Sequence, residues 1–292
     1  IFDTETTGLP RNWNAPITDT DNWPRCVQIA WQLHDDLGRL VEHQDFLIRP
    51  EGYNIPFDAE QIHGISTELA LQNGHELEEV LGLFNEALSK SEFVVGHNLN
   101  FDLNILGCEF HRKGKATRLN EIPVLDTCTE STALRCEIPG GRYGKFKLPT
   151  LTELYEELFK EPFQEAHNAT ADVEATTRCF LELIRLGHFS PEELGRDSSY
   201  LMDITALNKE TFAPVGLKHL NLKKESKKLR KKEQKAISES QKGTAVDQEA
   251  LQRAQYAHLH NHSQYSILQS TSNVTQLVKA AIDEQMPAVA LT

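Results

Sequence analysis

Hydrophobic residues change their spacing along this chain, and that change limits its fold most strongly. Residues 27–33 place apolar side chains at every second position, the period of a half-buried β-strand. A turn at residues 35–38 leads into a further strand at 40–48, and the apolar run at residues 1–6 ends in acidic residues as a buried strand would. These three strands predict an antiparallel meander.

From residue 77 onwards the spacing becomes helical and alternates with short apolar runs. We expect helices near residues 77–88, 101–111, 151–158 and 173–184, and strands near 92–96 and 122–127. Helices that alternate with strands imply parallel additions to the sheet. The sequence therefore predicts an α/β fold in which helices flank a mixed five-stranded sheet.

The remaining chain is less regular, and we divide the whole into three parts. Residues 1–188 form the α/β domain, and 189–255 form an extension and charged linker that reads in its second half as a solvated helix or spacer. A new apolar, His-rich pattern begins at residue 256 and gives a third part, 256–292. The fold of 190–255 is left open.

Composition fits a chain with a real core and no membrane span. Of its 292 residues, 39% are hydrophobic, and no apolar stretch approaches the ~20 residues that a span needs. No signal peptide is visible. The five cysteines are odd in number and form no CxxC pair, so we expect neither a disulfide framework nor a cysteine zinc site, and a reducing, cytoplasmic environment.

The net charge of −13 at first argues against a nucleic-acid partner. Residues 222–235, however, hold eight basic and two acidic residues, so this segment carries +6 and the rest −19. An acidic body binds phosphates when divalent cations lie between its carboxylates and the substrate. The basic segment itself fits either a solvated spacer, which we favour, or a contact with DNA phosphate.

Asp3 and Glu5 lie two residues apart on the first expected strand, so both carboxylates face the same side. Two like charges held together are costly unless a cation neutralises them. Hard oxygen ligands select Mg²⁺ or Mn²⁺. Taken alone, Asp3 and Glu5 are also consistent with ordinary solvent-exposed residues at the end of a strand.

Two later segments supply the other candidates. Asp102 falls in the first turn of an expected helix, where an acidic residue also favours the helix dipole. His167 lies on a loop, and Asp172 follows near the start of the last helix. Four carboxylates and one histidine suit two-metal phosphodiester hydrolysis, in which cations ~3.5–4 Å apart stabilise the attacking and leaving oxygens. The histidine suits a general base near neutral pH.

Three segments carry a resemblance to a known family. DTETTGL at 3–9, GHNLNFD at 96–102 and HNATAD at 167–172 resemble, in this order, the motifs of DnaQ-like (DEDDh) 3′→5′ exonucleases, which include proofreading epsilon subunits of bacterial replicative polymerases. The resemblance covers residues 1–188. It implies a ribonuclease H-like fold, His167 as general base, and two divalent cations, Mg²⁺ or Mn²⁺, on four catalytic carboxylates: Asp3, Glu5, Asp102 and Asp172.

The same resemblance implies contacts with the substrate. Thr6 and Leu9 match positions that meet the terminal nucleotide in the family, and His63 opens an HGI segment that helps to line the nucleotide pocket. A structural role for His63 stays open. The long loop after Leu9 holds Trp13 and Trp23, which suit either base stacking or packing, with packing favoured.

Residues 256–292 resemble the start of the PHP domain of bacterial DNA polymerase III alpha subunits. In such domains a His-x-His pair contributes metal ligands, here His260 and His262. Only this first motif is present, so we expect no complete metal site. Together the two resemblances imply one bacterial polypeptide that copies and proofreads DNA. Its partners would be a single-stranded or frayed DNA 3′ end, the polymerase domain of the full-length chain, and the sliding clamp.

Two other functions remain in view. An RNA-trimming 3′→5′ exoribonuclease would use the same five residues and would differ in 2′-hydroxyl contacts that the sequence does not show. A non-catalytic module that docks polymerase or DNA would be expected to have lost a metal ligand or the histidine, and none is lost. Oligomeric state and sequence preference are not indicated.

Overall fold

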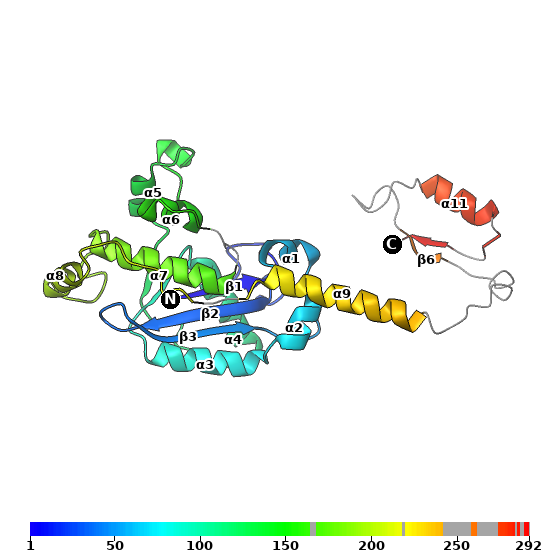
Figure 1. Cartoon of the computed structure of the whole chain (residues 1–292), viewed down its shortest axis with the longest axis horizontal. Helices are drawn as coiled ribbons and strands as arrows, with labels where there is room; N and C mark the ends of the chain where they lie inside the picture. Colours follow the sequence, from blue (N-terminus) through cyan, green and yellow to red (C-terminus); the bar gives the residue numbers. More distant parts are fainter. Residues whose placement is uncertain are drawn as a thin grey trace. The chain divides into compact units, whose positions relative to one another are not determined.

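A computed structural model describes residues 1–163, 168–217, 220–241, 258–261, 274–283, 285–286 and 289–291. The chain forms two compact units, Ile1–Lys232 and Glu233–Thr292. In the second unit, the elements described beyond residue 241 are β6 (His258–Asn261), α11 (Val274–Asp283) and β7 (Val289–Leu291), and β6 pairs in parallel with β7 (Figure 1).

The first unit opens with an antiparallel meander, as predicted. β1 (Phe2–Thr6), β2 (Cys26–His34) and β3 (Leu40–Leu47) pair in sequence order. β4 (Val94–Gly96) and β5 (Val124–Asp126) form a separate parallel pair, and β4 contacts β1. The mixed α/β character is confirmed, whereas one continuous five-stranded sheet stays a prediction.

The helices of the first unit follow the predicted spacing and add several short members. The expected long helices are present, while short ones fill the connections, and the basic segment forms the helix α9. Their bounds are α1 (Phe57–His63), α2 (Thr67–Asn73), α3 (Leu77–Ser89), α4 (Asn100–Arg112), α5 (Glu130–Cys136), the 3₁₀ turn η1 (Arg142–Gly144), α6 (Leu151–Phe159), α7 (Ala169–Arg185), α8 (Ser198–Leu207) and α9 (Leu222–Gln241).

Helices cover both faces of the meander (Figure 1). On one face Trp31 of β2 packs edge-on against Phe84 of α3, with ring centroids 5.5 Å apart. On the other face Ala30 packs against α7. Gln28 and Gln32 also point to α7 and accept hydrogen bonds from it, at 3.3 and 2.9 Å.

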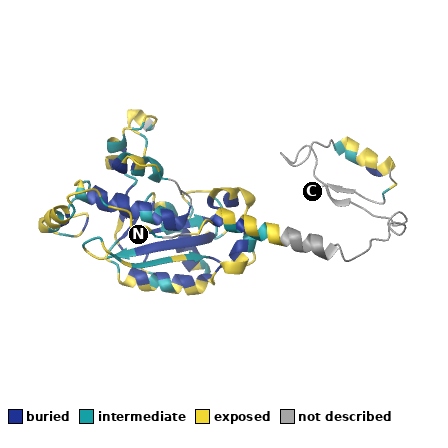
Figure 2. Cartoon of the chain, in the orientation of Figure 1, coloured by how far each residue is buried: buried dark blue, intermediate teal, exposed yellow. Residues whose placement is uncertain are grey.

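The expectation of a half-buried second strand is therefore wrong. Every residue from Cys26 to Gln32 is buried, as the uniform dark blue of β2 shows (Figure 2). The polar positions of the period-two pattern belong to glutamines whose hydrogen bonds with α7 compensate their burial. β2 is thus packed on both faces.

Two further findings bear on the composition. The five cysteines are all free, and three of them, Cys26, Cys108 and Cys179, are buried. Within the part of the chain that the structure describes, no helix has the length and apolar character needed to cross a membrane.

Candidate metal centre

Three carboxylates meet at one place in the first unit. One oxygen each of Asp3, Glu5 and Asp172 lies within 4.8 Å of the others, close enough to share a cation. Asp3 and Glu5 converge because alternate side chains of β1 share a face. Asp172 comes from the first turn of α7, where the N-cap Asn168 accepts hydrogen bonds from two backbone N–H groups.

Asp102 approaches from α4 and is held to the middle of the first motif. The Thr4 backbone N–H and hydroxyl both donate to Asp102 Oδ1, at 3.0 and 2.6 Å. Both residues are buried. Thr4 therefore links β1 to α4 from between the two motif carboxylates, and Asp102 adds a fourth charge beside the compact triplet.

The protein raises the pKa values of these acids. Burial, followed by the charges of Asp102 and Asp172, raises the pKa of Asp3 well above its usual range. The same causes raise the pKa of Glu5 to about 8, against the opposing charge of Lys223. Burial raises the pKa of Asp102 to about 7 although its hydrogen bonds from Thr4 act in the other direction.

This electrostatic arrangement fits a cation site. Carboxylates that repel one another in a half-buried place are stable as anions only when positive charge lies between them. The donors are all oxygen atoms, the ligand type of Mg²⁺, Mn²⁺ and Ca²⁺. The residues present therefore fit divalent cations, as the sequence predicted.

A further acid, Asp126, accepts hydrogen bonds from backbone N–H groups and is not one of the clustered carboxylates. At the end of β5 its carboxylate accepts hydrogen bonds from the N–H groups of Asn98, Leu99 and Cys128, at 2.8, 2.8 and 2.7 Å. Asn98 has a φ of 60°, in the left-handed region. Asp126 thus stabilises the turn that leads into α4 and hence the position of Asp102.

The predicted substrate contacts lie in contrasting environments. The Thr6 hydroxyl donates to the Gly8 carbonyl at 2.7 Å, and Leu9 is 72% exposed. His63 is buried at the end of α1, where its Nδ1 accepts a hydrogen bond from the Ile65 N–H at 3.1 Å. Their contact with a nucleotide stays a prediction.

The predicted histidines fall mainly where the structure gives no description. His167 and His262 lie outside the described residues. His260 belongs to β6, where the backbone is described. The roles of these three residues therefore remain predictions.

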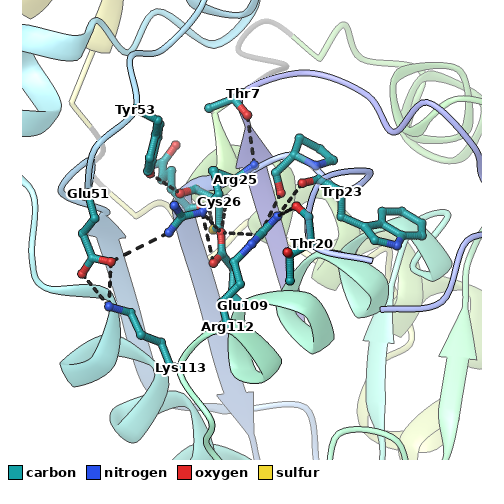
Figure 3. Close-up of polar contacts among 12 residues, drawn as sticks. Thr7, Thr20, Trp23, Arg25, Cys26, Glu51, Tyr53, Glu109, Arg112 and Lys113 are labelled. Carbon is teal, nitrogen blue, oxygen red and sulfur yellow. Dashed lines mark hydrogen bonds and ion pairs between the residues drawn. The ribbon is translucent and has the colours of Figure 1, made fainter. Parts of the chain in front are cut away.

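A buried polar network holds the loop between β1 and β2 against α4 (Figure 3). Glu109 of α4 is fully buried, accepts a hydrogen bond from Arg25 Nε at 2.9 Å and forms an ion pair with Arg112 at 3.2 Å. Arg112 donates in turn to the carbonyl oxygens of Thr20 and Trp23, both at 2.6 Å. The loop has no regular secondary structure, so these bonds fix its path.

The two tryptophans of this loop differ. Trp23 is 3% exposed and donates to the Pro16 carbonyl at 3.1 Å, which is a packing role. Trp13 is 51% exposed, and its ring lies 5.7 Å from that of Phe101, next to Asp102. Base stacking thus remains open for Trp13.

The sequence reasoning missed Glu109, Arg112 and Lys223. An acid and a base three residues apart on one helix would have been the signal for the first two. Lys223 was visible only as one of many lysines in the basic segment.

Comparison with known proteins agrees with this geometry. Residues 1–180 match the model of the exonuclease (RNase_T) family, and residues 258–292 match that of the PHP domain. The 3′-5′ exonuclease DinG of Bacillus subtilis is 32% identical over 212 residues, which are 71% of this chain and 20% of that protein. The PolC-type DNA polymerase III of Latilactobacillus sakei is 31% identical over 176 residues, 60% of this chain and 10% of that protein. The chain thus spans a fifth or less of the length of these two relatives.

Solved structures of exonuclease I share the fold. One aligns with a TM-score of 0.51 at 20% identity, covering 69% of this chain and 44% of that one. The Escherichia coli enzyme in complex with a 5cy-dT13 oligonucleotide aligns with a TM-score of 0.50 at 19% identity, covering 66% and 41%. Both sequence resemblances, to the exonuclease motifs and to the start of a PHP domain, are confirmed, and the chain belongs to the exonuclease family.

Proposed function

We propose that this chain is a metal-dependent 3′→5′ exonuclease that removes nucleotides from DNA ends. The observation that carries the proposal is the meeting of Asp3, Glu5 and Asp172 within 4.8 Å, with Asp102 held beside them. Residues far apart in sequence supply four carboxylates to one place. A solvated strand end would not gather them.

We propose two divalent cations, Mg²⁺ or Mn²⁺, with Asp3, Glu5, Asp102 and Asp172 as their ligands. When bound, the cations would supply the positive charge that phosphodiester hydrolysis requires at the scissile phosphate. The chain's own residues set where this happens: β1 fixes two carboxylates, Thr4 fixes Asp102 Oδ1, and the first turn of α7 fixes Asp172.

The proton acceptor in this proposal is His167. It directly precedes Asn168, the N-cap of the helix that carries Asp172, and this adjacency in sequence supports the role. A neutral imidazole takes the proton of the attacking water near pH 7. Thr6, Leu9 and His63 would contact the terminal nucleotide.

The relatives support DNA as the substrate and proofreading as the purpose. Two of them are named as a 3′-5′ exonuclease and a DNA polymerase III, and the exonuclease I complex contains a DNA oligonucleotide. We propose that residues 1–188 proofread within a polymerase III polypeptide, joined through 189–255 to a PHP domain that begins at 256. The polymerase domain and the sliding clamp would be its partners, in the bacterial cytoplasm.

The test uses matched 5′-labelled DNA and RNA single strands with Mg²⁺ or Mn²⁺, with EDTA and His167→Ala as controls. The expected result is a DNA ladder that shortens from the 3′ end and disappears in both controls. A clear preference for RNA would favour the exoribonuclease. No cleavage of either strand would favour a docking module.

A further inference from the structure

The helix α9 lies beyond the segment that matches the exonuclease model, yet it contacts the turn that follows His63. Gly64, at a φ of 82°, leaves so little room that a Cβ there would lie 2.4 Å from Lys223 Cγ and 2.7 Å from the Lys223 backbone nitrogen. The Ser226 hydroxyl donates to the Gly64 carbonyl at 2.7 Å and accepts from the Ser66 N–H at 3.1 Å. The start of α9 therefore packs directly against the turn at residues 64–66.

Three other contacts hold the same segment. Leu222 is buried in the cluster that includes Ile65. Arg230 forms an ion pair with Glu60 of α1 at 2.5 Å. On the approach to α9, the Leu220 carbonyl accepts a hydrogen bond from Asn168 Nδ2 at 3.4 Å. The segment thus touches both the His63 turn and the N-cap of the helix that carries Asp172.

The docked part of α9 is strongly basic, whereas the chain as a whole is acidic. Residues 222–232 hold seven basic residues and one acidic residue in a chain of net charge −13. Lys223 and Lys227 are both exposed, and their spacing of four places them on one face of the helix. The hydrogen bond between Asn168 and Leu220 brings the start of α9 next to the helix that carries Asp172.

We infer that Lys223 and Lys227 bind backbone phosphates of the strand whose 3′ end lies at the carboxylates, and that Ser226 positions them. The inference rests on the proposed nuclease function. A polyanion approaching an acidic body needs cations along its path, and lysines next to the reaction centre supply them without base specificity. The basic segment is in this view part of the substrate site, not a solvated spacer.

The test measures binding and cleavage by the full chain separately. Binding of a fluorescent DNA single strand is followed by anisotropy in EDTA, between about 50 and 300 mM NaCl. Cleavage is followed with Mg²⁺ on the same strand and on the p-nitrophenyl ester of thymidine 5′-monophosphate, which contains a single nucleotide. The variant is Lys223→Ala with Lys227→Ala, and Lys90→Ala with Lys115→Ala is the control that removes the same charge elsewhere.

For the lysine variant we expect Kd and KM for the strand to rise on the order of tenfold, and kcat/KM to fall more on the strand than on the single-nucleotide ester. The slope of log Kd against log salt should fall by about 1.4, since each single-strand phosphate contact contributes about 0.7. The control should keep the wild-type slope. Replacing both lysines by arginine should restore binding, and Ser226→Ala should raise KM for the strand by a larger factor than it lowers kcat on the strand.

An unchanged Kd and salt slope in the Lys223→Ala, Lys227→Ala variant would overturn the inference and leave the nuclease proposal intact. An equal loss in the Lys90→Ala, Lys115→Ala control would also overturn it, because the effect would then come from net charge. Absence of cleavage by the wild-type chain on both substrates would overturn the nuclease function instead, while the binding data would still decide whether these lysines contact the strand.

Discussion

Replacing Glu5 by glutamine should stabilise the metal-free protein at pH 8. The folded chain raises the pKa of Glu5 from 4.5 to about 8, so its folded form favours the protonated acid. Stability linked to a raised acidic pKa is present below the unfolded value and is lost as pH rises through the folded value. Between pH 4.5 and 8 the wild-type chain without metal should therefore become progressively less stable.

The size of this loss of stability follows from the difference between the unfolded and folded pKa values of Glu5. A pKa difference of this size corresponds to about 4–5 kcal/mol at pH 8. Burial is the largest cause of this shift, and the charges of Asp172 and Asp102 add to it. Glutamine is itself polar and buried there, so the substitution should recover part of the loss, about 2–4 kcal/mol. For a compact unit of this size, that gain raises Tm by roughly 5–12 °C.

The assay is thermal unfolding in EDTA at pH 4.5, 6 and 8, repeated with excess Mg²⁺ at pH 8. Glu5→Gln and wild type should coincide at pH 4.5 and separate as pH rises. Mg²⁺ should stabilise the wild type more than the variant, because only the wild type retains the full ligand set. Glu86→Gln, which removes an exposed charge from α3, is the control and should show neither effect. A Glu5→Gln protein less stable than wild type at pH 8 in EDTA would refute the electrostatic account.

Three other outcomes are expected. Asp3→Ala or His167→Ala should abolish most cleavage and leave the far-ultraviolet circular dichroism spectrum unchanged, and normal turnover by either variant would exclude the proposed mechanism. Thr4→Val removes a hydroxyl that donates to Asp102, a hydrogen bond to a charged group of about 1.5–3 kcal/mol, so Mg²⁺ titrations of activity should show a half-saturating concentration several-fold higher. Glu109→Gln leaves two arginines near a neutral amide in a buried place, and urea unfolding should show a loss of about 3 kcal/mol, which an unchanged midpoint would contradict.

Local patterns predicted where several of the candidate ligands lie on their strands and helices. The period of two in residues 3–5 indicated that two carboxylates share a face, and they do. Helical spacing placed Asp102 and Asp172 in the first turns of their helices, as the structure has them. These predictions succeeded because each depends on the geometry of one element. The family resemblance, and no local pattern, implied that the acidic residues of the three motifs lie close together in space.

Features that join distant segments could not be read in this way. Thr4 and Asp102 are 98 residues apart, and Glu109 bonds to Arg25 across 84. The helices α1 and α2 have seven residues each, too few to establish a helical period. The docking of α9 was hidden because the lysines around Leu222 give the segment the composition of a solvated helix.

The hydrogen bonds of Thr4 change how the first motif should be read in other sequences. Its two acids are the obvious marks, and the residue between them counts as a spacer. Here that spacer donates through both its backbone and its hydroxyl to an acid on another helix. Serine would keep the hydroxyl donor, whereas valine or alanine would keep only the N–H. A comparison of relatives that scores only the acidic positions would group active sites whose distant carboxylate is held in different ways.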